Sequence, residues 1–189
     1  MKIRINKEGK TKLMLSFALL IYSVYVYIST GSYLAFIAMF ASTIGDISIM
    51  SYRNCFHKKK NIHLMYGVVA FCVAHITYIL AMETYFSKLL LYVGIIAFIF
   101  LLSVLAFVSK RKSRDIVFFL YSIVIGCNLI NTFFYHNLAF TGMLLFVISD
   151  LVLLIGEKKK INGIWLQVII WATYVPAEVL LLTSLLSTL

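Results

Sequence analysis

The stretch GMLLFVISDLVLLIGEKKK, residues 142–160, decides the fold of this chain. It is apolar over several helical turns and ends in three consecutive lysines. A run of about 17–25 mainly apolar residues is the length of a helix that crosses a bilayer. Asp150 stands inside the apolar part, although a charged residue at the centre of a membrane helix costs roughly 2.5–3.5 kcal/mol on insertion scales. The stretch therefore predicts a transmembrane helix with a functional carboxyl group.

The rest of the chain has the same apolar character. Of its 189 residues, 62% are hydrophobic and 13% are charged, whereas a soluble domain has about 45–50% apolar and about 25% charged residues. Runs of this length form helices and not barrel strands, so we expect an all-α, polytopic transmembrane bundle. A basic N-terminal segment, 1–12, precedes a single membrane domain, 13–189. Seven spans are predicted, near 13–30, 32–52, 62–82, 87–109, 116–133, 138–156 and 163–187.

The basic residues alternate between the connections. All of the 17 lysines and arginines except Lys88 precede the first span or follow the second, fourth and sixth. The positive-inside rule makes that side cytoplasmic, which puts the N-terminus inside and the C-terminus outside. The net charge of +10 is thus a topology signal, with some attraction to anionic lipid, and not a nucleic-acid site. We expect a multi-pass protein of a bacterial cytoplasmic membrane.

Three of the seven acidic residues lie inside predicted spans: Asp46, Asp150 and Glu178. A rise of about 1.5 Å per residue puts the two aspartates roughly 9 Å below the cytoplasmic boundary, and Glu178 nearer the middle. His75 is the one deep histidine. Apart from Lys88 at the outer end of the fourth span, no lysine or arginine falls within the predicted spans, so some carboxyl groups must be protonated, share a proton, or meet water or a cation. This favours a functional polar pocket.

Helical spacing brings further residues onto the faces that carry these groups. The three stripes consist of Gly67, Phe71, His75 and Tyr78; of Gly142, Phe146 and Asp150 with the adjacent Ser149; and of Tyr174 and Glu178. Pro176, which lies between the last two, lacks an N–H and leaves the carbonyl of Ala172 without its helical donor. A plainer interpretation stays open, in which the histidine and tyrosines form hydrogen bonds between helices and the glycines serve close packing.

Together these motifs resemble the YhhN family of integral-membrane lysoplasmalogenases. That family shows a G-D at the end of one helix, G-x3-F-x3-H-x2-Y on the next, G-x3-F-x2-S-D-x2-L later, and Y-x2-A-Q-x-L near the C-terminus. In this chain the matching residues are Gly45 and Asp46; Gly67, Phe71, His75 and Tyr78; Gly142, Phe146, Ser149, Asp150 and Leu153; and Tyr174, Ala177, Glu178 and Leu180. Glu178 replaces the usual glutamine. The family usually has eight spans, and this chain is expected to begin at the second.

The resemblance implies a hydrolase that cleaves the vinyl-ether bond of a lysoplasmalogen to a fatty aldehyde and a glycerophospho head group. It implies Asp46 and Asp150 as the catalytic pair, in which a carboxylic acid protonates the alkene carbon and a carboxylate stabilises the resulting cation and activates water. The supporting residues, which tune the acids, position water or bind the glycerol hydroxyl, are His75, Tyr78, Ser149, Tyr174 and Glu178. The expected partners are a lysolipid substrate and membrane lipids, without a cofactor.

Three other functions stay open. A proton- or cation-coupled transporter also uses carboxylates and a histidine within spans. The third and sixth spans share a G-x3-F-x3 pattern and cross the membrane in opposite directions, as the halves of an inverted repeat would, but this similarity rests on few residues. A membrane metallohydrolase would need ligands from His75 and the three acids, but one deep histidine and three cysteines without metal-ligand spacing disfavour zinc, so we expect no metal. A non-catalytic lipid-binding protein is the third alternative.

Overall fold

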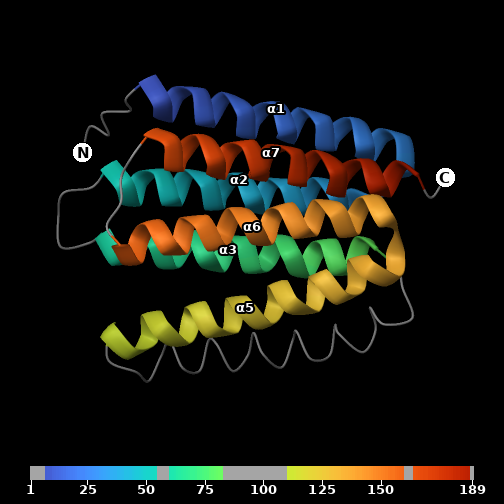
Figure 1. Cartoon of the computed structure of the whole chain (residues 1–189). Helices are drawn as coiled ribbons and strands as arrows, with labels where there is room; N and C mark the ends of the chain where they lie inside the picture. Colours follow the sequence, from blue (N-terminus) through green and yellow to red (C-terminus); the bar gives the residue numbers. More distant parts are fainter. Residues whose placement is uncertain (1–6, 55–59, 83–109, 160–163, 188–189) are drawn as a thin grey trace.

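The computed structural model describes residues 7–54, 60–82, 110–159 and 164–187, and these residues contain helices and no strand. The helices, shown in Figure 1, are α1 (Lys7–Thr30), α2 (Tyr33–Asn54), α3 (Lys60–Ala81), α5 (Lys110–Tyr135), α6 (Asn137–Lys159) and α7 (Ile164–Leu186). Gly31, with a φ of 72°, donates its N–H to Tyr27 O and ends α1, a role that suits glycine because it tolerates the left-handed conformation.

All six described helices are long and apolar enough to cross a membrane, so the prediction of an all-helical membrane protein is confirmed. Their apolar spans are Thr11–Thr30, Tyr33–Ser51, Ile62–Ala81, Ile116–Tyr135, Asn137–Gly156 and Trp165–Leu186. The first begins before Lys12, which the sequence pattern placed outside the membrane. The predicted span 87–109 lies outside the described residues, so the number of seven spans stays a prediction.

The described helices form a closed ring. Each packs against the next in the order α1, α2, α3, α5, α6 and α7, and α7 returns to α1. A smaller contact between α2 and α7 crosses this ring. The three acids inside the predicted spans lie on three helices of this ring, Asp46 on α2, Asp150 on α6 and Glu178 on α7.

The basic ends of the helices gather at one end of the bundle. In Figure 1, α1, α3, α5 and α7 begin at the left, where α2 and α6 end. Every lysine and arginine on the described helices belongs to this end, from Lys7, Lys10 and Lys12 on α1 to Lys158 and Lys159 on α6. This is the one-sided distribution that the charge pattern predicted. Which side of the membrane it faces stays a prediction.

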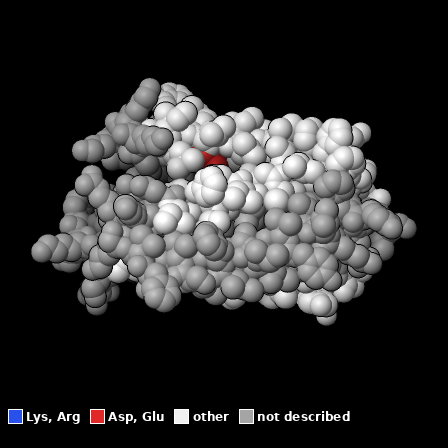
Figure 2. Space-filling view, turned by 90° about the horizontal axis from the view of Figure 1, so that it is seen from below, with Lys and Arg blue, Asp and Glu red and all other residues white. Residues whose placement is uncertain are grey.

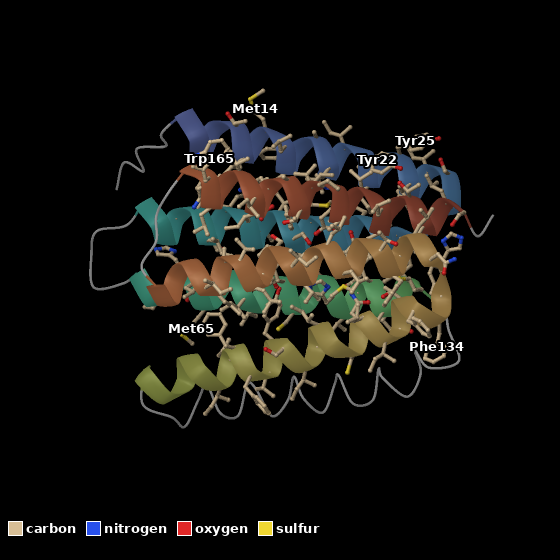
Figure 3. The ribbon with its side chains drawn as sticks, in the orientation of Figure 1. Met14, Tyr22, Tyr25, Met65, Phe134 and Trp165 are labelled. Atoms are coloured by element: carbon tan, nitrogen blue, oxygen red, sulfur yellow. The ribbon has the colours of Figure 1, made fainter. Side chains whose placement is uncertain are left out.

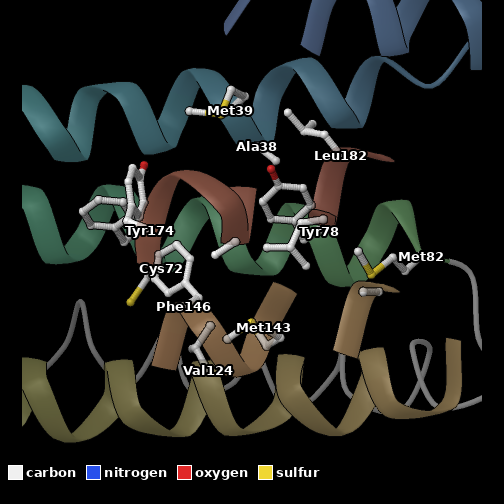
Figure 4. Close-up of a cluster of buried hydrophobic side chains, with 14 of the residues drawn as sticks. Ala38, Met39, Cys72, Tyr78, Met82, Val124, Met143, Phe146, Tyr174 and Leu182 are labelled. Carbon is white, nitrogen blue, oxygen red and sulfur yellow. The ribbon is translucent and has the colours of Figure 1, made fainter. Parts of the chain in front are cut away.

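The outer surface of the bundle is apolar. Met14, Tyr25 and Trp165 are 72%, 57% and 78% exposed, and Figure 3 shows Met14 and Tyr25 directed away from the helices. A continuous apolar surface of this kind is unfavourable in water but matches the hydrocarbon interior of a bilayer. The interior contains a cluster of buried aromatic, aliphatic and methionine side chains, part of which is drawn in Figure 4.

Glycines bring neighbouring helices into close contact. A Cβ at Gly45 of α2 would lie 2.7 Å from the ring of Phe71 on α3, and a Cβ at Gly142 of α6 would lie 2.9 Å from the backbone oxygen of Ala177 on α7. At Gly67 it would lie 2.8 Å from Ile49. The packing interpretation of Gly67 and Gly142 is therefore confirmed, and α7 remains helical through Pro176.

Candidate active site

Asp46 lies at the junction of α1, α2 and α7. Its Oδ2 accepts a hydrogen bond from Ser16 Oγ of α1 at 2.7 Å and a second from the hydroxyl of Tyr174 on α7 at 3.0 Å. The carboxyl group thereby joins three helices. Two hydroxyl donors on one oxygen make this an environment in which a carboxylate is well satisfied although it lies among apolar helices.

Asp150 lies on α6, and its hydrogen-bond partner is on a different helix. The hydroxyl of Tyr121 on α5 donates to Asp150 Oδ2 at 2.6 Å, so this pair joins α5 to α6. Asp46 and Asp150 do not bind each other. They are also less completely covered than Glu178, which has no exposed surface.

Figure 2 shows one red acidic patch on the described part of the face viewed from below, and no blue on it. Glu178 is completely buried, and only three acidic side chains are described in sufficient detail to be placed. Asp46 and Asp150, in contrast, each keep part of the side chain exposed.

Glu178 is the deepest of the three acids. Its Oε2 accepts a hydrogen bond from the hydroxyl of Tyr78, which reaches across the interior from α3, at 2.7 Å. The hydroxyls of Ser42 and Tyr174 also lie close enough to the Glu178 carboxyl group to interact with it, although its Oε1 has no partner of full hydrogen-bond geometry among the described residues. Glu178 interacts electrostatically with both Asp46 and Asp150, so the charges of the three acids influence one another.

A single rule describes the three acids: each accepts a hydrogen bond from a tyrosine on another helix. Tyr174 donates to Asp46, Tyr121 donates to Asp150, and Tyr78 donates to Glu178. All three tyrosine side chains are buried. A buried carboxyl group needs hydrogen-bond donors, and a phenol supplies one without adding a positive charge.

Side-chain contacts connect the two aspartates through the interior. The ring of Tyr174 lies 5.5 Å from Phe146, Phe146 lies 4.5 Å from His75, and His75 lies 6.1 Å from Tyr121, measured between centroids. Figure 4 shows Tyr174 and Phe146 in the same part of the buried cluster. The path from Asp46 to Asp150 thus runs through aromatic groups and one imidazole.

His75 is 1% exposed, and among the described residues one polar side chain lies within hydrogen-bond distance of its ring. Its Nδ1 lies 3.0 Å from Nδ2 of Asn128 on α5. Its Nε2 and Asn128 Oδ1 have no hydrogen-bond partner among the described residues. Buried polar atoms of this kind are normally satisfied by protein, water or ligand, so His75 offers a hydrogen-bonding position to a molecule inside the bundle.

Ser149, which the motif groups with Asp150 as a supporting residue, forms its hydrogen bond elsewhere. Its hydroxyl donates to the backbone oxygen of Ile170 on α7 at 3.2 Å, although Asp150 is its neighbour in sequence. Ser149 is buried. In this structure it contributes to the packing of α6 on α7, about two turns further along α6 than the close approach at Gly142.

Lys12 adds a positive charge to the Asp46 junction. Its ammonium donates to Gln167 Oε1 and lies 5.7 Å from the ring centroid of Trp171, both on α7. It also interacts electrostatically with Asp46. The expectation that the acids lack a cation within the spans is therefore wrong for Asp46, because α1 and its apolar span begin before Lys12.

The described residues contain no group of three or more histidine, cysteine, aspartate or glutamate side chains that could hold a metal ion. Cys72 and Cys127 are free thiols. The polar groups of the site are therefore carboxyls, phenols, the Ser16 hydroxyl, one imidazole, the Asn128 amide and the Lys12 ammonium. This set can transfer protons and form hydrogen bonds.

The structure brings most of the predicted site residues into one connected region and adds four others. His75, Tyr78, Tyr174, Glu178 and the two aspartates belong to it. Ser16, Tyr121, Asn128 and Lys12 were missed. Serine and tyrosine are common in apolar helices, so only the arrangement of the helices identifies which of them meet a carboxyl group.

The chain was compared with known proteins. The model of the YhhN family matches residues 10–185, which is nearly the whole chain and includes every residue of the site. No curated protein and no solved structure matches the chain.

Proposed function

We propose, from the premise that this chain belongs to the YhhN family, that it is a membrane hydrolase that cleaves the vinyl-ether bond of lysoplasmalogen-type lysolipids. The products are a fatty aldehyde and a glycerophospho head group. The observation that carries the proposal is the pair of aspartates within apolar spans, each held by a tyrosine from another helix. Carboxyl groups at such depth are retained in membrane helices mainly for function.

The environments of the two aspartates support a division of roles. Asp46 accepts two hydrogen bonds and has the ammonium of Lys12 in its field. Asp150 accepts one hydrogen bond, from Tyr121. An ionised carboxylate only accepts hydrogen bonds and is favoured by a nearby cation, so we assign the carboxylate role to Asp46 and the proton-donor role to Asp150.

The reaction begins when the Asp150 carboxylic acid protonates the alkene carbon that is not bonded to the ether oxygen. This gives an oxocarbenium ion, whose positive charge the Asp46 carboxylate stabilises. Water then adds to the carbon bonded to oxygen and gives a proton to Asp46. The hemiacetal collapses when its hydroxyl proton passes to Asp150 and Asp46 protonates the departing glycerol oxygen. Both aspartates return to their starting states, and one water is consumed.

The groups between the aspartates support this chemistry. An alkenyl chain is apolar and matches the aromatic surface of Phe71, Phe146 and Tyr174. His75 Nε2 and Glu178 Oε1, which have no partner of full hydrogen-bond geometry among the described residues, are suited to hold water or the glycerol hydroxyl. In this proposal His75, Tyr78 and Glu178 support the reaction by holding water or the glycerol hydroxyl.

The proposal is tested with purified protein and a vinyl-ether lysolipid, with aldehyde release as the readout. We expect wild-type protein to release aldehyde, and Asp46→Asn and Asp150→Asn each to lose at least about a hundredfold in kcat, as is typical when a positioned acid or base is removed. Thr173→Val, which alters a hydroxyl bonded only to its own helix, is the control. Full activity in both asparagine variants would overturn the proposal.

A further inference from the structure

Lys12 has an unusual position for a lysine at the end of a membrane span. Such side chains commonly extend outward to reach the water and the lipid head groups. The side chain of Lys12 is instead directed across to α7, where Gln167 accepts a hydrogen bond and Trp171 lies beneath the ammonium. It is only partly exposed. The charge is therefore held in a defined place before any ligand arrives.

This place is next to the Asp46 junction. Ser16, whose hydroxyl donates to Asp46, lies one helical turn after Lys12 on α1 and also bonds the Lys12 backbone oxygen. On α7, Gln167 and Trp171 precede Tyr174, the second donor to Asp46. The same two helices thus hold the ammonium near the end of the span and, deeper, the two hydroxyls that donate to Asp46 of α2; Ser16 is one turn, or about 5 Å, deeper than Lys12 along α1.

We infer that Lys12, with Gln167 and Trp171, binds the phosphodiester of the lysolipid head group. This inference rests on the proposed function, because it uses Asp46 as the reacting end of the site. The alkenyl carbon and the phosphorus of such a lysolipid are separated by six bonds, which span about 7 Å when extended. That length matches a head group at the level of Lys12 and a vinyl ether at the level of Asp46.

The chemistry of the three side chains fits a phosphate oxygen. An ammonium has three N–H donors, so it can bind Gln167 and a phosphate oxygen at the same time. The Gln167 side chain also has an amide N–H₂ that can donate to a second oxygen. Because Gln167 and Trp171 already orient the ammonium, little further side-chain freedom is lost when the phosphate binds.

The test compares two vinyl-ether substrates that differ only in the head group: a 1-alkenyl-glycerophosphoethanolamine and the corresponding 1-alkenylglycerol, which has no phosphate. We expect Lys12→Gln to lower the ratio of their kcat/KM values by about tenfold or more, since a charge-assisted hydrogen bond is lost. Lys12→Arg should restore most of the ratio. An unchanged ratio in Lys12→Gln overturns the inference, because Lys12 then acts only through Asp46.

Lys110→Gln is the matched control, because it removes the same charge at the start of α5. Its ratio should equal that of wild-type protein, and an equal fall in both variants would assign the effect to general surface charge and overturn the inference. Inorganic phosphate is the second arm. Competition by inorganic phosphate as strong as that of the lysolipid would identify a site for free phosphate and would also overturn the head-group assignment.

Binding of saturated ether lipids separates this inference from the proposed function. A 1-alkyl-glycerophosphoethanolamine cannot undergo vinyl-ether hydrolysis, yet it carries the phosphodiester. We expect wild-type protein to bind it about tenfold or more tightly than the 1-alkylglycerol, and Lys12→Gln to lose that preference. If the protein releases no aldehyde but shows this preference, the proposed function fails and the head-group site stands. Equal binding of the two lipids by wild-type protein overturns the site.

Discussion

Individual hydrogen bonds explain how this bundle tolerates three acids. Each buried carboxyl group meets a phenol from a neighbouring helix, and Asp46 also meets Ser16 and the charge of Lys12. Without a donor, a carboxyl group within the membrane costs several kcal/mol. The phenols therefore do more than pack. They fix the positions of the acids on which the proposed reaction depends.

The pair formed by Tyr121 and Asp150 gives a prediction at this scale. Tyr121→Phe removes the one hydrogen bond that the described residues donate to Asp150, so the acid is no longer held in one rotamer. We expect aldehyde release to fall by roughly tenfold or more while the protein stays folded. Tyr25→Phe, at a position that is 57% exposed on the outer surface of α1, is the control. Equal activity in Tyr121→Phe and wild-type protein would show that this hydrogen bond has no part in the reaction.

At the scale of the helices, the close contacts through glycine position the site. Gly142 is one turn before Phe146 and two turns before Asp150 on α6, and it lies against the α7 backbone next to Glu178. Gly45 adjoins Asp46 and lies against Phe71. A change in either packing distance moves an aspartate relative to the aromatic groups between the two acids.

Gly142→Ala is the corresponding prediction. The new Cβ would lie 2.9 Å from the Ala177 oxygen and 3.2 Å from the Leu181 nitrogen, both backbone atoms that cannot turn aside. We expect a loss of about 1–3 kcal/mol in the free energy of unfolding, as for overpacked cores.

Gly126→Ala is the matched control for this measurement. Gly126 is within α5 and has no atom within 4 Å of the position of a Cβ. Alanine should therefore be neutral or stabilising by up to about 1 kcal/mol through its helix propensity. Denaturant titration of both variants in detergent measures the difference. Equal stability of Gly142→Ala and Gly126→Ala would contradict the packing described for α6 and α7.

Sequence patterns predicted the helices better than the contacts between them. Apolar length located the described spans to within a few residues, because the bilayer imposes that length on each helix separately. The deep positions of Asp46, Asp150 and Glu178 followed from the same segments. Their partners did not. Tyr121 and Ser16 carry no signal of their own, since only the ring order of the helices places α5 beside α6 and α1 beside α2. Lys12 was missed because the start of a span cannot be fixed to one residue by hydropathy.

For the molecule as a whole, the clustered basic helix ends and the apolar exterior describe an integral membrane protein with one strongly basic end. Both aspartates lie in the half of the bundle nearer this end. A lysolipid in the leaflet at the basic end would thus have its head group at the level of Lys12 and its chain alongside the helices. Orientation therefore determines which leaflet supplies the substrate.

Reporter fusions test the orientation. The positive-inside rule puts the basic end in the cytoplasm. We expect alkaline phosphatase, which is active only outside the cytoplasm, to be active when fused after Gly31 or Leu189 and inactive when fused after Lys60. A fluorescent protein fused at the same sites should show the complementary pattern. Phosphatase activity at Lys60 together with inactivity at Leu189 would show that the protein has the opposite orientation in the membrane.

The central claim is that this bundle hydrolyses a vinyl ether by protonating carbon, and the reaction in heavy water tests it most directly. Purified protein is incubated with a vinyl-ether lysolipid in D₂O, and the aldehyde is trapped at once as a hydrazone for mass spectrometry. The account predicts an aldehyde with one deuterium on the carbon next to the carbonyl, and it predicts that Asp150→Asn abolishes this product. Absence of aldehyde from folded wild-type protein, or an aldehyde without carbon-bound deuterium, would contradict the account.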